Sequence, residues 1–227
     1  MQSKELLFCS LSSWYPLFKD LTFQSAVIPL GQEFLDYLGE DGVALPEPVQ
    51  QPDRNDMDRY DYDSDEWENE DEAALCSFPD LQEKILMTIK SFGGEAFPKF
   101  TWSSPKDAVW LTFGSTLKCT SPAEVFLLLK GSDFVSHDLD HAMGLCEDVP
   151  SGPTSHYLTL RKWESMDLSL EFRCFVRDGH LLAVSQRHAG VFYPFLPKDK
   201  DRLQEQACTF MNNVVIPRLQ SRISRCV

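Results

Sequence analysis

The sequence predicts an α+β protein in which helices pack on one side of antiparallel strands. Hydrophobic residues make up 43% of the 227 residues, which is enough for a substantial core. Segments with apolar residues at helical spacing occur beside short segments in which polar and apolar residues alternate. Asp178-Gly179 separates two of these strand-like segments, and this pair favours the tight turn of an antiparallel hairpin.

The first third of the chain divides into two parts. Residues 1–44 are rich in aromatic side chains and are predicted to pack on the main domain. Residues 45–75 are predicted to be a disordered acidic loop, because residues 53–72 contain eleven Asp or Glu and only two Arg. The preferred interpretation is that this acidic run is simply exposed to solvent. The alternative is a dock for a basic partner, which Tyr60, Tyr62 and Trp67 would support.

From residue 76 the pattern of a folded domain returns and continues to residue 216. Asp80 and Glu83 predict a helix start, and Gly93-Gly94 predicts its end. Ser121-Pro122 predicts a second helix start. Strands are expected over 96–100, 107–113, 157–163, 170–177 and 181–187, and a last helix over 199–215. Pro217 is expected to end that helix, so that 217–227 forms a polar, unstructured tail.

Charge and cysteine content exclude several classes of protein. The net charge is −14, which argues against non-specific binding to nucleic acid or to an anionic membrane. The seven cysteines include no C-x-x-C pair, which favours a reducing compartment over a disulfide framework or a zinc site. No apolar run approaches 18 residues and no signal peptide is expected. We therefore expect a soluble protein of the cytosol or nucleus, and of these we favour a cytoplasmic location. We also expect a monomer.

Several cations recur within the strand-like segments. Lys99 interrupts an apolar strand, which is costly unless its ammonium group snorkels to water or meets an anion. The segment 161–163, Arg-Lys-Trp, closes another strand and could act as a nucleotide-binding hinge, or could simply leave the sheet. A convergent set of these cations would suit a polyphosphate, although no glycine-rich phosphate loop is present. The set comprises Lys99, Lys106, Arg161, Lys162, Arg173 and Arg187.

The hairpin offers a second candidate feature. In the ideal register of a two-residue turn, Arg173 faces Val184 and Glu171 faces Gln186. Glu171 and Arg173 then project from the face opposite Phe172, Cys174, Val176, Leu181 and Ala183. They form either an exposed ion pair or the lining of a cleft. The ideal register places Arg187 on the apolar face, where a bulge could redirect it.

Motifs for nucleophilic or zinc catalysis are missing from the sequence. It contains neither G-x-S-x-G nor H-E-x-x-H. His137 and His141, four residues apart, could form a metal-binding turn, but a solvated polar loop is the preferred interpretation.

A set of segments in order resembles the cell division cycle protein 123 family, also called D123. The segments are SSWYPLF (12–18), VIPL (27–30), FPKFTWSSPKDAVW (97–110), LKCTSPAEVFLLLKGSDF (117–134), LTLRKW (158–163) and LEFRCFVRDGHLLAVSQR (170–187). The resemblance runs from about residue 5 to 215 and includes the acidic loop.

This resemblance implies an ATP-grasp-like fold that binds ATP with magnesium. It implies an assembly chaperone for eukaryotic translation initiation factor 2 that binds the gamma subunit and promotes its joining to the alpha and beta subunits. The family's pattern assigns Lys99, Ser104, Lys106 and Asp107 to one half of the ATP site. It assigns Arg161, Lys162 and Trp163 to the adenine-side hinge, and Glu171, Arg173 and Arg187 to ribose and phosphate contacts.

The sequence departs from the family at two places. His188 stands where the family usually has an acidic residue after Arg187. The family's magnesium ligands lie in later strands, and this sequence ends at Val227 without them. We therefore expect a C-terminally truncated or alternatively ended form with no metal ligands of its own and no catalytic residues assigned. The alternatives are an ATP-grasp ligase-type enzyme, or a form that binds the partner but not ATP.

Overall fold

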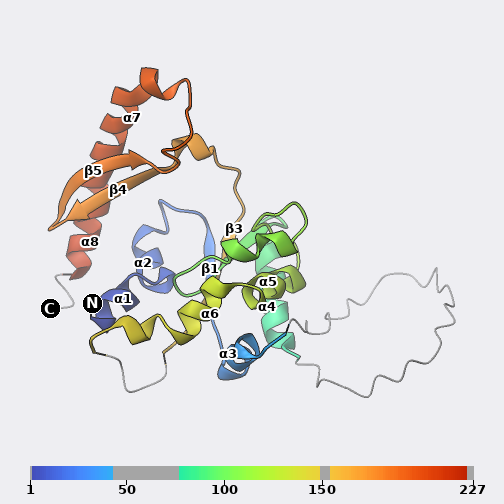
Figure 1. Cartoon of the computed structure of the whole chain (residues 1–227). Helices are drawn as coiled ribbons and strands as arrows, with labels where there is room; N and C mark the ends of the chain where they lie inside the picture. The colour runs from blue at the N-terminus through green and yellow to red at the C-terminus, as the bar shows by residue number, and fades with distance from the viewer. Residues whose placement is uncertain (1, 43–76, 149–153, 224–227) are drawn as a thin grey trace, which may run out of the picture. The chain divides into compact units, whose positions relative to one another are not determined.

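The computed structural model describes residues 2–42, 77–148 and 154–223, with side chains described up to residue 220 (Figure 1). The predicted acidic loop over 45–75 lies entirely outside these residues. The chain divides into two compact units, residues 1–163 and 164–227. Within the described part of the chain, no helix is long and apolar enough to cross a membrane.

The first unit contains helices and a three-stranded antiparallel sheet. Its elements are α1 (Ser3–Phe8), α2 (Leu11–Phe18), β1 (Ser25–Pro29), α3 (Gln32–Gly39), α4 (Pro79–Ser91), β2 (Ala96–Lys99), η1 (Lys106–Leu111), α5 (Pro122–Lys130), α6 (Asp133–Asp140), η2 (Met143–Leu145) and β3 (Tyr157–Lys162). The sheet has the order β1-β3-β2, so a strand from the N-terminal segment pairs with the far end of the unit. The mixed helix and antiparallel-sheet class is as predicted.

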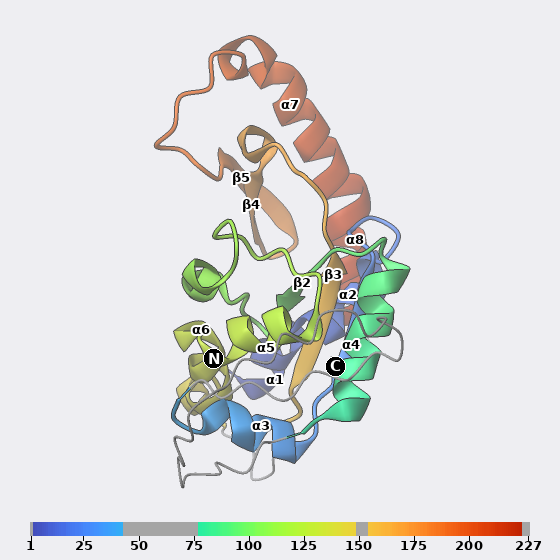
Figure 2. The same ribbon diagram turned by 90° about the vertical axis from the view of Figure 1, so that its right-hand side faces the viewer.

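The two faces of this sheet carry different side chains. Leu158 and Leu160 of β3 point to the main core with Ile28, which pairs across from Leu158. Helices α4 and α5 cover the sheet on this side, and α4 runs beside β3 in Figure 2. Arg161 lies on the opposite face, where its guanidinium carbon is 5.9 Å from the ring of Trp14 in α2. The prediction that helices cover only one side was therefore wrong.

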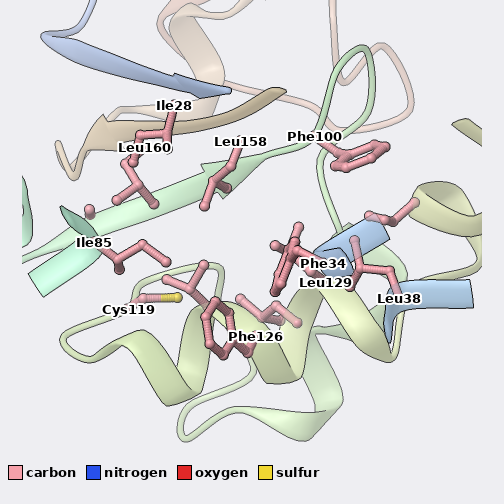
Figure 3. Packing of buried hydrophobic residues seen from close by; sticks show 14 of the residues in the cluster. Ile28, Phe34, Leu38, Ile85, Phe100, Cys119, Phe126, Leu129, Leu158 and Leu160 are labelled. Carbon is pink, nitrogen blue, oxygen red and sulfur yellow. The ribbon is translucent and has the colours of Figure 1, made fainter. Parts of the chain in front are cut away.

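The core is built around a cluster of aromatic and aliphatic side chains (Figure 3). The ring of Phe126 in α5 lies 5.1 Å from that of Phe34 in α3, and Phe34 lies 5.1 Å from Phe78. These contacts join the N-terminal segment to helices that come after the acidic run in the sequence. The predicted start of α5 is confirmed, because Ser121 and Glu124 form a reciprocal capping box.

Two local predictions in this unit were wrong. Residues 107–113 were predicted as a strand, but Lys106–Leu111 form the 3₁₀ helix η1. The reason is a tertiary contact, since Asp107 accepts a hydrogen bond from Ser132 at the start of α6. Helix α4 begins at Pro79, which is suited to a first helical position, so Asp80 lies in the first turn and is not the cap. Its predicted end is confirmed, since Gly93 and Gly94 both have positive φ.

The second unit contains one hairpin and two consecutive helices. Its elements are η3 (Leu168–Leu170), β4 (Phe172–Arg177), β5 (His180–Gln186), α7 (Leu196–Phe210), the π-helical η4 (Met211–Val215) and α8 (Ile216–Ile223). Figures 1 and 2 both show α7 lying along the hairpin, which it contacts through β5. The predicted turn is confirmed, because Asp178 and Gly179 have φ values of 50° and 74°.

A β-bulge changes the register of this hairpin. Val176 pairs with Leu181, but Phe175 pairs with Ala183, so Leu182 has no partner in the ladder. Arg173 consequently faces Ser185, and the predicted pairing with Val184 was wrong. The one-residue shift turns every later residue of β5 to the other face. The half-buried residues on the α7 side therefore include Val184 and Gln186, whereas Ala183 is exposed.

The C-terminal helix also differs from the prediction. It begins at Leu196 and passes through the π-helical segment η4 into α8, which contains Pro217 and continues to Ile223. Pro217 was predicted to end the helix because its ring clashes with the preceding turn and it lacks an N–H group. The π-helical turn just before Pro217 avoids this conflict. Its backbone hydrogen bonds join residues five apart in place of the usual four, so the helix can continue past the proline. Residues 217–223 are therefore helical, not an unstructured tail.

Candidate functional site

The predicted ATP-site residues are distributed over both units. Seven lie in the first unit: Lys99, Ser104, Lys106, Asp107, Arg161, Lys162 and Trp163. Three lie in the second unit: Glu171, Arg173 and Arg187.

Three cations of the first unit lie close together. Lys99 and Arg161 share one face of the sheet, because Phe97 pairs with Arg161 and Lys99 pairs with Thr159. Burial lowers the pKa of the Lys99 ammonium group, and the positive charges of Arg161 and Lys106 lower that pKa further. Like charges gathered at a half-buried position repel one another, and a bound anion would relieve that repulsion. We call Lys99, Lys106 and Arg161 the cation cluster.

The guanidinium group of Arg161 is held by the N-terminal segment. Its central carbon lies 4.9 Å from the ring of Phe23 and 5.6 Å from that of Phe97. Two hydrogen bonds fix its orientation, from NH2 to Thr22 Oγ1 at 2.7 Å and from Nε to Ser25 Oγ at 3.3 Å. Burial lowers the pKa of Arg161 from its very high ordinary value. The stacking and the hydrogen bonds compensate for this desolvation, so residues 22–25 set the position of this cation.

A buried carboxylate anchors the loop that joins Lys99 to Lys106. Asp138 in α6 is only 4% exposed. Its Oδ2 accepts hydrogen bonds from the backbone N–H groups of Trp102 at 3.0 Å and Ser103 at 2.7 Å, and its Oδ1 accepts one from Ser103 Oγ at 2.8 Å. Asp138 also raises the pKa of Lys99, in opposition to the neighbouring cations. It therefore fixes the loop and balances part of the positive charge.

Asp107 has a similar anchoring contact at the other end of the same loop. One carboxylate oxygen accepts a hydrogen bond from Ser132 Oγ at 2.6 Å, and the other accepts one from the backbone N–H of Phe134 at 3.3 Å. Both donors belong to the N-terminal turn of α6, where a negative charge is favourable. Ser104 lies between the two anchors and donates a hydrogen bond to the carbonyl of Pro98 at 3.4 Å.

The predicted hinge residues after Arg161 point in different directions. Lys162 follows Arg161 in β3, so the strand alternation turns it to the face of Leu160. The ring of Trp163 packs edge-on against Phe97 at 6.1 Å, and its backbone N–H donates to the carbonyl of Glu95 at 3.2 Å. The structure thus gathers Lys99, Lys106 and Arg161 but turns Lys162 to the other side of the sheet.

The bulge brings the three predicted residues of the second unit onto one face of the hairpin. The backbone N–H of Arg187 donates to the carbonyl of Glu171 at 2.8 Å, which places the two residues opposite each other. Their side chains form an ion pair with NH1 2.5 Å from Oε2. Arg173 is exposed on the same face. The ideal-register expectation that Arg187 lies on the apolar face was therefore wrong.

A buried histidine contacts the anchored loop. His156 is 5% exposed, its ring stacks on Phe100 at 5.2 Å, and its Nδ1 shares a hydrogen bond of 3.1 Å with Thr101 Oγ1. Burial lowers the pKa of His156, although Asp138 and Asp140 oppose the effect. The folded state thus binds a proton on this ring less readily than the unfolded chain does.

This difference predicts a pH dependence of stability. The unfolded chain takes up the proton near pH 6.5, while the folded chain takes it up only at lower pH. The contribution of His156 is therefore fully present above about pH 6.5, and it falls by up to about 1.4 kcal/mol for each pH unit below that value. Urea unfolding between pH 5.5 and 7.5 measures this slope, and His156→Gln is expected to make it shallower. Identical slopes for both proteins would contradict the assignment.

Asp138 and the contacts of Arg161 were not predicted. Asp138 lies in a polar helix, DFVSHDLD, and no local pattern marks it as the buried member. The side chains around Arg161 come from 136–139 positions earlier in the sequence and from β2. Neither a residue type nor a spacing along the chain indicates such contacts.

Known proteins resemble this chain in sequence and in fold. The D123 family model matches residues 14–224. The "Translation initiation factor eIF2 assembly protein" of Xenopus laevis is 36% identical over an alignment of 212 residues that covers 90% of this chain and 63% of that protein. The "Cell division cycle protein 123" of Aspergillus terreus is 37% identical over 212 residues, 88% of this chain and 50% of that protein.

A solved structure agrees with this relationship. Cdc123 from Schizosaccharomyces pombe matches with a TM-score of 0.75 at 35% identity, over 94% of this chain and 75% of that one. A C-terminally truncated form of the same protein matches with a TM-score of 0.74. The chain belongs to the D123 family. It spans about half to two thirds of the length of the curated relatives that it matches.

Proposed function

We propose that this chain takes part in the assembly of translation initiation factor eIF2 and binds ATP through the cation cluster. The first part rests on its relatives, since proteins 34–36% identical from Xenopus laevis and Dictyostelium discoideum are named eIF2 assembly proteins. Assembly of a translation factor fits a cytoplasmic role. As a chaperone, the chain would need to bind a subunit but to catalyse no reaction.

The observation that supports ATP binding most directly is that Lys99 and Arg161 share one face of the sheet, while Lys106 ends the loop that follows Lys99. Charge-assisted hydrogen bonds from cations to phosphate oxygens are short and strong, and this loop is anchored at both ends. We assign the phosphates to this cluster and an ATP-grasp-like architecture to the fold. Trp163 would contact the adenine side, whereas the side chain of Lys162 lies on the opposite face of the sheet. The fixed guanidinium group of Arg161 would act mainly by its charge.

The described residues do not fit a magnesium site made by the protein alone. No group of three His, Cys, Asp or Glu side chains comes together among them. Asp107 and Asp138 are engaged by α6 and by the loop, respectively. We therefore assign no magnesium ligand to the described part of this chain, and the proposal for ATP depends on its cations.

Removing one charge from the cluster tests the assignment. Lys99→Met keeps much of the side-chain length but loses a charged contact of about 1.5–3 kcal/mol, so ATP affinity is expected to fall about 10- to 100-fold. Isothermal titration calorimetry of the 227-residue chain with ATP measures this loss. The matched control is Lys90→Met, because Lys90 is exposed at the end of α4. Equal affinities for both variants would contradict phosphate binding at the cluster.

We further propose that the gamma subunit of eIF2 is the direct partner. The family resemblance suggests it, and a chain that binds the gamma subunit without ATP remains the main alternative. Calorimetry separates the two, since a chain that binds the gamma subunit but shows no heat with ATP would support the alternative.

A further inference from the structure

Two histidines outside the cation cluster lie one turn apart at the end of α6. His137 is in the last turn and His141 is the C-terminal cap residue, whose backbone N–H donates to the carbonyl of His137 at 3.0 Å. Their ring centroids are 5.8 Å apart and the ring planes differ by only 18°. Both residues are exposed. The sequence had favoured a solvated polar loop here, but the helical backbone places both imidazoles on one face.

We propose that His137 and His141 form a binding site for a divalent transition metal ion, namely Zn²⁺, Ni²⁺ or Cu²⁺. Neutral imidazole is a preferred ligand for these ions. Two histidines at positions i and i+4 of a helix are also the spacing that zinc-binding helices use. With metal–nitrogen bonds of about 2.0–2.1 Å, the two ring centroids would lie roughly 5 Å apart. Because the stacked rings do not aim their nitrogen lone pairs at one point, both exposed side chains would have to rotate to bind the ion.

The site would be open on its outer side. Among the described residues no third His, Cys, Asp or Glu joins the two rings. The remaining coordination positions would therefore hold water or a donor atom from another molecule. Mg²⁺, which prefers oxygen ligands, should not bind to two imidazoles.

Metal binding at this place would stabilise α6. The helix has only eight residues, too few to be stable alone, and its Asp138 holds the loop of the cation cluster. An ion bound across one turn of the helix favours the folded chain by mass action. This inference is independent of ATP binding, since neither histidine belongs to the cation cluster.

Thermal unfolding of the tag-free chain tests the proposal. Titration with NiCl₂ or ZnCl₂ is expected to raise Tm by about 3–6 °C at a tenfold excess over Kd, and MgCl₂ should produce no such rise. The double variant His137→Asn/His141→Asn should lose the rise. The matched control His180→Asn/His188→Asn, which alters two histidines of the second unit, should keep it. An equal rise in both double variants, or no saturable rise in the unaltered chain, would overturn the proposal.

A direct readout locates the ion. Paramagnetic Ni²⁺ should first broaden the NMR signals of the His137 and His141 rings and of nearby amides in α6. The single variants His137→Asn and His141→Asn should each weaken this broadening, which guards against a folding defect in the double variant. Broadening centred on His156, His180 or His188 would place the ion elsewhere and refute the site.

Discussion

Asp138→Ala is expected to lower the free energy of unfolding of the first unit by about 3–5 kcal/mol. The substitution removes the acceptor of three hydrogen bonds, two of them from backbone N–H groups of the loop. Hydrogen bonds to a charged group contribute about 1.5–3 kcal/mol each, and an unsatisfied buried donor adds a further cost. The loop between Lys99 and Lys106 would lose its anchor as well.

Tryptophan fluorescence during urea unfolding measures this effect in the right unit, because all five tryptophans lie between Trp14 and Trp163. The control is Asp140→Ala, which removes an exposed carboxylate near the end of the same helix and should change stability by less than about 0.5 kcal/mol. Asp138→Asn keeps one acceptor oxygen and should fall between the two. A loss below about 1 kcal/mol for Asp138→Ala would contradict the anchoring role.

Phe126→Ala is the second large effect and is also expected to cost about 3–5 kcal/mol. Phe126 is 0% exposed and packs against Phe34 and Phe78. Truncation removes the ring from the packing contact between α3 of the N-terminal segment and the helices that follow the acidic run in the sequence. The cavity left by the ring would add to the free-energy cost of the lost burial, because the surrounding aromatic side chains can fill it only partly.

The matched control for Phe126→Ala is the same substitution at Phe113, whose side chain is 100% exposed. Phe113→Ala should leave the urea midpoint of the tryptophan transition nearly unchanged. Similar losses for both variants would show that the aromatic cluster does not hold the N-terminal segment in the core.

Local signals predicted those elements that local chemistry determines. The helix start at Ser121, the glycines after α4 and the Asp-Gly turn were all predicted and are all present in the structure. The 3₁₀ helix η1 could not be predicted in the same way, because Asp107 is fixed by a contact with Ser132, 25 residues away. The passage of the last helix through Pro217 also depends on a π-helical turn that its composition does not indicate.

The candidate site was predictable by residue type but not by arrangement. The position of a lysine within an apolar strand drew attention to Lys99, which the structure places at a half-buried position. Which cations lie near it depends on strand pairing, and which groups hold Arg161 depends on a segment more than 130 residues earlier. Arg187 shows the limit most clearly, since a single unpaired residue, Leu182, decides the face on which it lies.

The most direct test of the proposed function is reconstitution of eIF2 from its purified subunits with and without this chain. The account predicts that the chain binds the gamma subunit and raises the yield of the complex of gamma with the alpha and beta subunits. Lys99→Met should reduce that yield, while Lys90→Met should leave it unchanged. No binding to the gamma subunit, with an unchanged yield of the complex, would contradict the account.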